Sequence, residues 1–250
     1  MIIDQFIDEN EIISAPAVYG KREKTLDVAL ITFSSEIFKD AKEMEGSSVL
    51  SVISAAGGKY EIIKLPVKEK RVGIFLTPCG APAAGGLMED VNAITGVDNF
   101  ILFGSCGTLD HGKTDGKYIV VDEAYRDEGL SYHYLPPSDY LSITNWKTVE
   151  NFFREHEVPH VVGKTWTTDA FYRETRSSMA KRKEEGCIAV EMEIAGCQAV
   201  ATRRGWNFYP FLESGDKLDG EEWSIGNLKG ANHQNRKLFL AIELAKALKC

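Results

Sequence analysis

The sequence predicts a single α/β domain built around a mainly parallel sheet. Short apolar runs rich in Val, Ile and aromatic residues alternate with segments of helical periodicity, and this alternation is typical of strands joined by crossover helices. The 250 residues contain no internal repeat and no low-complexity linker, although their length would suit one large domain or two small ones. We therefore expect one domain over residues 1–250, of which 1–25 form an N-terminal extension.

Strands are predicted where Gly, Pro, Asn or Asp bound an apolar run. In chain order these runs are 27–33, 60–65, 71–77, 99–104, 117–122, 160–166, 187–192 and 207–212. Helical patterns lie between and after them, at 35–45, 84–95, 148–156, 174–185, 193–204 and 232–248. Ser35 is a plausible N-cap for the first helix, and Gly186 and Gly205 are C-cap signals for two others.

The charge balance and the cysteines limit the classes of function. The chain has 29 Lys and Arg against 37 Asp and Glu, a net charge of −8. Nucleic acids and anionic membranes are therefore not expected as partners, and an anionic substrate would need a local group of bases. The five cysteines are widely spaced without a Cys-x-x-Cys pair, which favours reduced thiols in a cytoplasmic enzyme over disulfides or a metal site. Neither a signal peptide nor a membrane span is indicated.

Candidate binding residues follow the predicted strands, because ligands of open α/β sheets bind beyond the carboxyl ends of strands. Gly104 and Ser105 begin a Gly-Ser-Cys-Gly turn after the 99–104 run. Its backbone N–H groups and the Ser hydroxyl could bind an anion. The alternative is a simple turn into the next element.

Two carboxylates, Glu191 and Glu193, flank Met192 after the 187–190 run. Carboxylates in apolar surroundings are costly unless they bind something. They could accept hydrogen bonds from two neighbouring sugar hydroxyls, or stabilise the positive charge that develops on a sugar ring when its glycosidic bond breaks. The alternative is a helix start with acidic residues at the positive end of its dipole.

Two further segments carry candidate residues for a planar, protonatable group. Asp216 follows the last buried strand next to Gly215, where a general acid could sit, unless it forms an Asx turn. Phe171 or Tyr172 could stack on a planar base and Arg173 could hydrogen-bond to it. The alternative is that Phe171 and Tyr172 are core aromatic residues at a strand–helix junction.

Taken together, these segments resemble the nucleoside phosphorylase superfamily. That group contains purine nucleoside phosphorylase, uridine phosphorylase and the methylthioadenosine/adenosylhomocysteine nucleosidases. The resemblance rests on four motifs in the family's order and at similar spacing, and it covers residues 27–246. The motifs are GSCG at 104–107, DAFY at 169–172, VEME at 190–193 and SGD at 214–216. Each motif alone is weak, and the ordered set is specific.

The resemblance implies a three-layer domain with a central mixed sheet, assembled as homodimers or as hexamers made of dimers. It implies cleavage of the N-glycosidic bond of a nucleoside in salvage, without a cofactor and with inorganic phosphate as a co-substrate in the phosphorylases. The positions of Met192 and Glu193 would hold the ribose, and that of Ser105 would lie near phosphate and ribose. The position of Phe171 would stack near the base, and that of Asp216 would protonate or hydrogen-bond N7 of a purine.

Two departures from the family pattern concern phosphate. Leu102 stands where phosphorylases usually carry an arginine, and residues 32–36 lack the arginine of the family's Gly-Asp-Pro-x-Arg segment. Lys64 corresponds loosely to a further phosphate arginine. The nucleosidases also lack these arginines and use a Glu to activate water, a place that Glu36 could take. The alternative for Glu36 is a solvated residue in the first turn of a helix.

The signals for the base conflict. Asp216 indicates a purine, whereas the Ser-Tyr-His-Tyr segment at 131–134 and Arg173 resemble the uridine phosphorylase branch. The leading hypothesis is phosphorolysis to free base and (deoxy)ribose 1-phosphate. Hydrolysis with Glu36 as the base is the alternative, and a non-catalytic nucleoside-binding protein is a second alternative.

Overall fold

The computed structural model describes residues 4, 6–20, 23–55 and 57–249. Its strands form one ten-stranded sheet. They are β1 (Val28–Thr32), β2 (Ser48–Ala55), β3 (Gly58–Lys64), β4 (Val72–Leu76), β5 (Asn99–Thr108), β6 (Tyr118–Asp127), β7 (Tyr140–Ser142), β8 (His160–Thr168), β9 (Cys187–Glu191) and β10 (Asn207–Lys217). Every predicted strand contains one of these strands or part of one, while β2 and β7 were not predicted.

The sheet is mixed and partly closed. Parallel pairings join β1 to β4 and β5, β10 to β5, and β8 to β6 and β9. Antiparallel pairings join β10 to β6 and β9 to β5, so β5, β10, β6, β8 and β9 form a closed ring. From β5 the sheet continues outward through β1, β4, β3 and β2. The predicted α/β fold with a central mixed sheet is confirmed.

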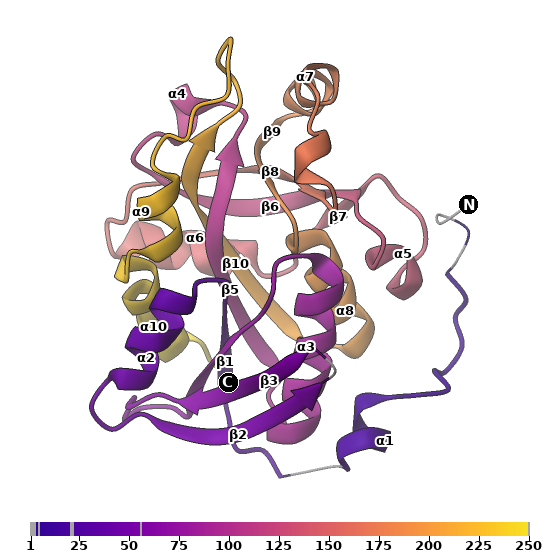
Figure 1. Cartoon of the computed structure of the whole chain (residues 1–250), viewed down its shortest axis with the longest axis vertical. Helices are drawn as coiled ribbons and strands as arrows, with labels where there is room; N and C mark the ends of the chain where they lie inside the picture. The colour runs from indigo at the N-terminus through magenta and orange to yellow at the C-terminus, as the bar shows by residue number, and fades with distance from the viewer. Residues whose placement is uncertain (1–3, 5, 21–22, 56, 250) are drawn as a thin grey trace.

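Helices cover both faces of the sheet. They are α1 (Ala15–Tyr19), α2 (Ser35–Glu43), α3 (Ala81–Thr95), α4 (His111–Thr114), α5 (Ser131–Tyr134), α6 (Trp146–Glu155), α7 (Arg176–Glu184), α8 (Ile194–Arg204), α9 (Leu228–His233) and α10 (Arg236–Ala247). Apolar residues of α3 and α8 pack into one core, and those of α2, α6 and α10 into the other. In Figure 1, α2 and α10 accordingly lie to the left of the sheet and α3 and α8 to its right.

Burial explains which strands could be predicted. Every residue of β1 is buried, because helices cover both of its faces, and such strands appear as continuous apolar runs. The residues of β2 are mostly exposed or half-buried at the edge of the sheet, so they give no comparable apolar run. Strands β5 and β10 extend beyond their apolar runs into the small and polar residues of the predicted motifs.

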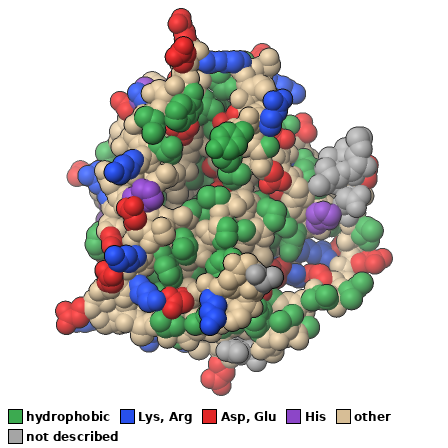
Figure 2. Space-filling model, viewed as in Figure 1, with side chains coloured by type: hydrophobic (Ala, Val, Ile, Leu, Met, Phe, Trp, Pro, Cys, Tyr) green, Lys and Arg blue, Asp and Glu red, His purple; other side chains and the backbone are tan. Residues whose placement is uncertain are grey.

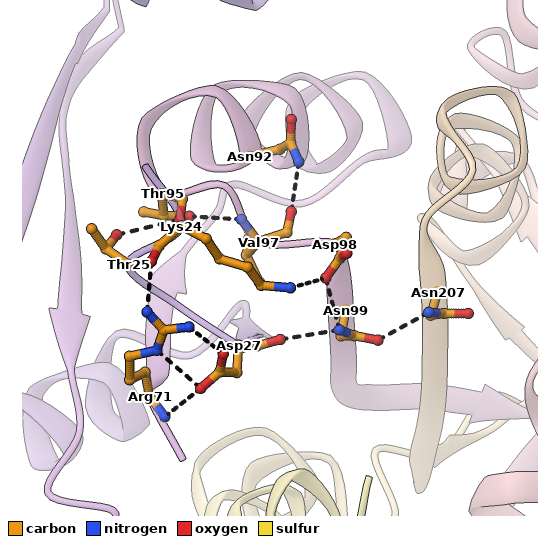
Figure 3. Close-up of polar contacts among 10 residues, drawn as sticks. All are labelled: Lys24, Thr25, Asp27, Arg71, Asn92, Thr95, Val97, Asp98, Asn99 and Asn207. Atoms are coloured by element: carbon orange, nitrogen blue, oxygen red, sulfur yellow. Dashed lines mark hydrogen bonds and ion pairs between the residues drawn. The ribbon is translucent and has the colours of Figure 1, made fainter. Parts of the chain in front are cut away.

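Polar contacts tie the strands together at the end where β1, β5 and β10 begin (Figure 3). The guanidinium of Arg71 donates to both carboxylate oxygens of Asp27, at 3.1 and 2.6 Å. Asn99 donates to the backbone carbonyl of Asp27 at 3.1 Å and accepts from Asn207 at 3.0 Å. These contacts fix the relative positions of the strands, so their opposite ends form a stable edge.

Among the described residues, no helix is both long and apolar enough to cross a membrane.

Candidate active site

A cavity of about 820 Å³ opens where β1, β5, β9 and β10 end. All four predicted motifs reach it, although they lie far apart in the sequence. The predicted site residues that line it are Gly104, Ser105, Phe171, Tyr172, Glu191, Met192, Glu193 and Asp216. Hydrophobic side chains gather on the upper part of the face shown in Figure 2, and Phe171, Tyr172 and Trp223 are exposed aromatic residues of the cavity lining.

Glu193 offers a buried carboxylate to the cavity. Its side chain lies at the start of α8 and is 7% exposed. Oε1 accepts a hydrogen bond from the backbone N–H of Gly80 at 2.6 Å, which fixes the carboxylate against the segment before α3. Burial, and then the charge of Glu191, raise the pKa of Glu193 above its usual range. A hydroxyl-bearing ligand would find here an acceptor that is already oriented.

Glu191 has a different role, because its oxygens are already occupied. Oε1 accepts from the hydroxyls of Thr167 at 2.5 Å and Thr165 at 3.3 Å. Oε2 accepts from the backbone N–H groups of Glu193 and Ile194, both at 2.7 Å. These two N–H groups belong to the first turn of α8, where orphan donors need acceptors. Glu191 therefore anchors the turn that carries Glu193.

Asp216 lies near the end of β10, beside a register shift between Ser214 and Lys217. Such an irregularity re-aims side chains. Its Oδ2 accepts a hydrogen bond from the indole Nε1–H of Trp223 at 2.8 Å. Gly107 of β5 lies beneath it: a Cβ there would be 2.9 Å from Cγ1 of Val190 and 3.4 Å from Oδ1 of Asp216. The second glycine of the GSCG motif thus leaves room for the side chains of Val190 and Leu218, which pack beside this carboxylate.

A further carboxyl group, Glu174, lines the cavity at the same end as Asp216. Burial, with the charge of Asp216 adding to it, raises the pKa of Glu174 to about 7. The neighbouring rings of Phe171 and Tyr172 contact each other in a tilted arrangement, with centroids 3.9 Å apart and an interplanar angle of 37°. This end combines planar aromatic surfaces with a carboxyl group that exchanges its proton near neutrality.

Hydroxyl and cationic groups gather around Ser105. Its hydroxyl donates to the side-chain oxygen of Asn232 in α9. Ser34, at the end of β1, has its Oγ 2.9 Å from Nδ1 of His233, and the ammonium of Lys237 lies in the same lining. Sequence reasoning missed these three α9 and α10 residues. It assigned 232–248 to one continuous helix, and nothing in the pattern distinguishes a residue buried against the sheet from a solvated one.

Three predicted residues do not line the cavity. The Glu36 side chain is 65% exposed, with Oε2 3.8 Å from Nδ1 of His233. Lys64 is exposed at the end of β3, and Arg173 is exposed at the end of a short 3₁₀ turn, Phe171–Arg173. Leu102, which stands in place of an arginine of the family pattern, is 1% exposed within the apolar core.

Comparison with known proteins identifies the family. The model of the Phosphorylase superfamily matches residues 27–249. The chain belongs to this superfamily. Purine nucleoside phosphorylases of the DeoD type from strains of Bacillus cereus and Bacillus thuringiensis are each 28% identical over 159 residues, which is 62% of this chain and 68% of theirs.

Solved structures of the superfamily share the fold. A purine nucleoside phosphorylase from Toxoplasma gondii in complex with immucillin-H superposes with a TM-score of 0.72 at 18% identity, over 89% of this chain and 90% of that one. An AMP nucleosidase from Bacteroides thetaiotaomicron gives a TM-score of 0.67 at 18% identity, over 88% and 87%. These two likenesses show the fold, and the family match makes this chain an enzyme of the Phosphorylase superfamily.

Within this superfamily the 131–134 segment, which resembles the uridine phosphorylase branch, forms α5 outside the cavity lining. It is built around the buried guanidinium of Arg126, which donates to Ser131 at 2.8 Å and to the carbonyl of Pro136 at 2.7 Å. The guanidinium also stacks over the ring of Tyr132, 4.0 Å from its centroid. Within this chain the segment therefore has a structural explanation of its own.

Proposed function

We propose that the protein cleaves the N-glycosidic bond of a purine nucleoside by phosphorolysis. The products would be the free base and (deoxy)ribose 1-phosphate. The observation that carries this proposal is that Glu193, Asp216 and Ser105 line one cavity. The names of the DeoD-type relatives support a purine.

The sugar would bind at Glu193. The carboxylate would accept hydrogen bonds from two vicinal ribose hydroxyls, and Gly80 holds it in place. As the C1′–N bond lengthens, positive charge develops on the sugar ring. The positive charge that develops lowers the pKa of the neighbouring carboxyl group. Glu193 would therefore give up its proton to solvent as the bond breaks, and its carboxylate would stabilise the sugar cation more in the transition state than in the ground state. The anchoring of α8 by Glu191 keeps Glu193 oriented for this interaction.

The base would leave beside the Phe171/Tyr172 pair and the carboxyl groups of Asp216 and Glu174, which line the same cavity. The electron pair of the broken bond goes to the leaving purine, which then needs a proton or a hydrogen bond at N7. Asp216 would supply it, and Glu174, with its pKa raised to about 7, would provide a second carboxyl group for the base edge. General acid assistance of this kind contributes roughly 10²–10⁴ in rate.

An oxygen of phosphate would form the new bond to C1′. Phosphate binding needs donors and positive charge, and the Ser105 end of the cavity carries the hydroxyls of Ser34 and Ser105 with His233 and Lys237. The test is to incubate the protein with inosine, guanosine, adenosine and uridine, with and without inorganic phosphate. Chromatography follows the free base and ribose 1-phosphate. Base release that requires phosphate and yields ribose 1-phosphate is expected.

Hydrolysis is the second candidate, favoured by one contact. Glu36 Oε2 lies 3.8 Å from His233 Nδ1 beside the cavity, and this pair could activate water in place of phosphate. Base release without phosphate, yielding free ribose and lost in Glu36→Gln, would replace phosphorolysis by this reaction. Tight nucleoside binding without base release across the panel would sink both enzymatic proposals and leave a binding protein.

We also propose that the chain assembles as a homodimer or as a hexamer of dimers, which the family resemblance supports. Light scattering coupled to size-exclusion chromatography measures the mass directly. A mass equal to that of one chain would reject this proposal.

A further inference from the structure

Lys237 is a cation buried in the wall of the candidate active site. It lies in the first turns of α10, is 1% exposed and lines the cavity. Nothing in the sequence pattern singles it out. Burying an ammonium group costs considerable free energy unless the charge is paired and its donors are used. Its partners therefore indicate what the charge is for.

The ammonium group is held by two acceptors. It donates to Oε2 of Glu213 at 2.7 Å and to the backbone carbonyl of Ala231. A lysine ammonium has three N–H donors, and no third acceptor is found among the described residues. Burial lowers the pKa of Lys237, and the charge and hydrogen bond of Glu213 oppose that shift. Glu213 thus keeps the ammonium charged and in place while one donor stays free.

These contacts put the ammonium at the Ser105 end of the cavity. Glu213 on β10 is the direct register partner of Ser105 on β5, and adjacent strands lie about 4.8 Å apart. The second acceptor, Ala231, precedes Asn232, which accepts the hydrogen bond of the Ser105 hydroxyl. In Figure 1, α9 and α10 follow each other along the left side of β5 and β10. Lys237 and Ser105 therefore border the same corner.

The other cations of the lining are less suited to an anion. Among the described residues they are Arg176 and His233. The Arg176 guanidinium donates to the backbone carbonyls of Gly220 and Glu221, so it holds the turn after β10. His233 is engaged with Ser34 through Nδ1. Arg176 is exposed and His233 is half-buried, so Lys237 is the buried cation of this lining.

We propose that Lys237 binds inorganic phosphate beside Ser105 and supplies a cationic donor at this corner of the cavity. This inference rests on the proposed phosphorolysis. A lysine ammonium binds phosphate as a point charge, and hydroxyl donors from Ser105 and Ser34 complete the contacts. Glu213 is a positioning residue that acts through Lys237. The acidic chain thereby concentrates its phosphate-binding charge in one buried group.

The first test compares Lys237→Met with Lys246→Met, a lysine of the same helix that pairs with Glu243 at the surface. Steady-state kinetics measure KM for phosphate and KM for the nucleoside separately. We expect Lys237→Met to raise KM for phosphate roughly tenfold or more, since a charged hydrogen bond is lost, with KM for the nucleoside within about twofold. Lys246→Met should match the wild type. An unchanged KM for phosphate in Lys237→Met overturns the proposal.

A second test does not depend on whether Lys237→Met folds. Glu213→Gln keeps the lysine but removes the charge that supports its protonation, so the pKa of Lys237 falls further. KM for phosphate in this variant should then rise at a lower pH than in the wild type. The other titratable groups that feel the charge of Glu213 are Cys106 and Tyr118, whose pKa values are raised by burial and also by this charge. An unshifted pH profile contradicts the role of Lys237, even if Lys237→Met fails to fold.

Direct binding separates this inference from the proposed reaction. Inorganic phosphate should raise the Tm of the wild type and of Lys246→Met, and raise that of Lys237→Met much less. If the wild type releases base equally well without phosphate, phosphorolysis fails. Lys237 is then judged by the phosphate-dependent Tm alone, where equal stabilisation of wild type and Lys237→Met rejects the site.

Discussion

The indole Nε1–H of Trp223 donates a hydrogen bond to Oδ2 of Asp216 at 2.8 Å. This bond connects the end of β10 to the turn that follows it, and Arg176 supports the same turn through the carbonyls of Gly220 and Glu221. Trp223 itself is 60% exposed, so packing contributes little to its position. The hydrogen bond therefore orients a carboxylate of the candidate active site and holds an aromatic ring over the cavity mouth.

Trp223→Phe should lower kcat/KM for purine nucleosides by roughly three- to tenfold, because an oriented hydrogen bond of about 1 kcal/mol is removed while an aromatic ring is kept. Trp223→Leu removes the ring as well and separates the two contributions. Steady-state kinetics with inosine measure both variants. A Phe variant with wild-type kcat/KM would show that Asp216 does not depend on this bond.

Asp216→Asn should reduce purine cleavage by roughly 10²-fold or more, since the group that protonates N7 is lost. Pyrimidine nucleosides have no N7, so any cleavage of uridine should fall much less. Asp115→Asn, at a mostly exposed carboxylate that lies 3.6 Å from His111, is the control. Equal losses for purine and pyrimidine substrates would remove the argument for N7.

Glu174 predicts a specific pH dependence. With its pKa raised to about 7, its carboxyl group is protonated below that pH and can donate a hydrogen bond to the base; above it the donor is lost. If the base needs this donor, kcat/KM should decline as the pH rises through about 7. Glu174→Gln keeps a donor at every pH, so its profile should lose that decline. A variant with an unchanged alkaline limb would exclude Glu174 from base recognition.

The parts of this site that the sequence revealed share one property. The strands that lead to GSCG, VEME and SGD are buried apolar runs, and the polar residues at their ends stand out against them. The sequence around Lys237 shows no such contrast between an apolar run and a polar residue at its end. Its burial depends on Glu213, 24 residues earlier in the chain, and on the break between α9 and α10, neither of which leaves a periodic signal. Glu191 and Glu193 look equivalent in sequence, and only their hydrogen bonds distinguish an anchor from a free acceptor.

Because Glu191 anchors α8 and Glu193 is a free acceptor, replacing each by Gln should change the stability of the protein in opposite directions. Glu191→Gln replaces one of the two oxygens by an amide nitrogen, which donates and does not accept. Either the backbone N–H groups of Glu193 and Ile194 or the hydroxyl of Thr167 then lose their acceptor. Leaving buried donors unpaired costs about 1–3 kcal/mol. Urea unfolding should therefore show a clear loss of stability. An unchanged midpoint would mean that α8 does not rely on this anchor.

Glu193→Gln should instead affect stability in a way that depends on pH. The folded state raises the pKa of Glu193 above the unfolded value of 4.5, so the folded protein holds this proton more tightly. Its contribution to the free energy of unfolding is complete below pH 4.5 and is lost as the pH rises through the folded pKa. Gln has no proton to lose.

Relative to the wild type, the Gln variant should gain stability between about pH 5 and about pH 9, while base release falls because the charge that stabilises the sugar cation is gone. Urea unfolding of both proteins at these two pH values gives the difference. Glu184→Gln, at an exposed position of α7, should show no such trend. A constant difference between wild type and Glu193→Gln would mean that burial does not hold the proton on Glu193. The carboxylate would then be ionised and available to sugar hydroxyls throughout this range.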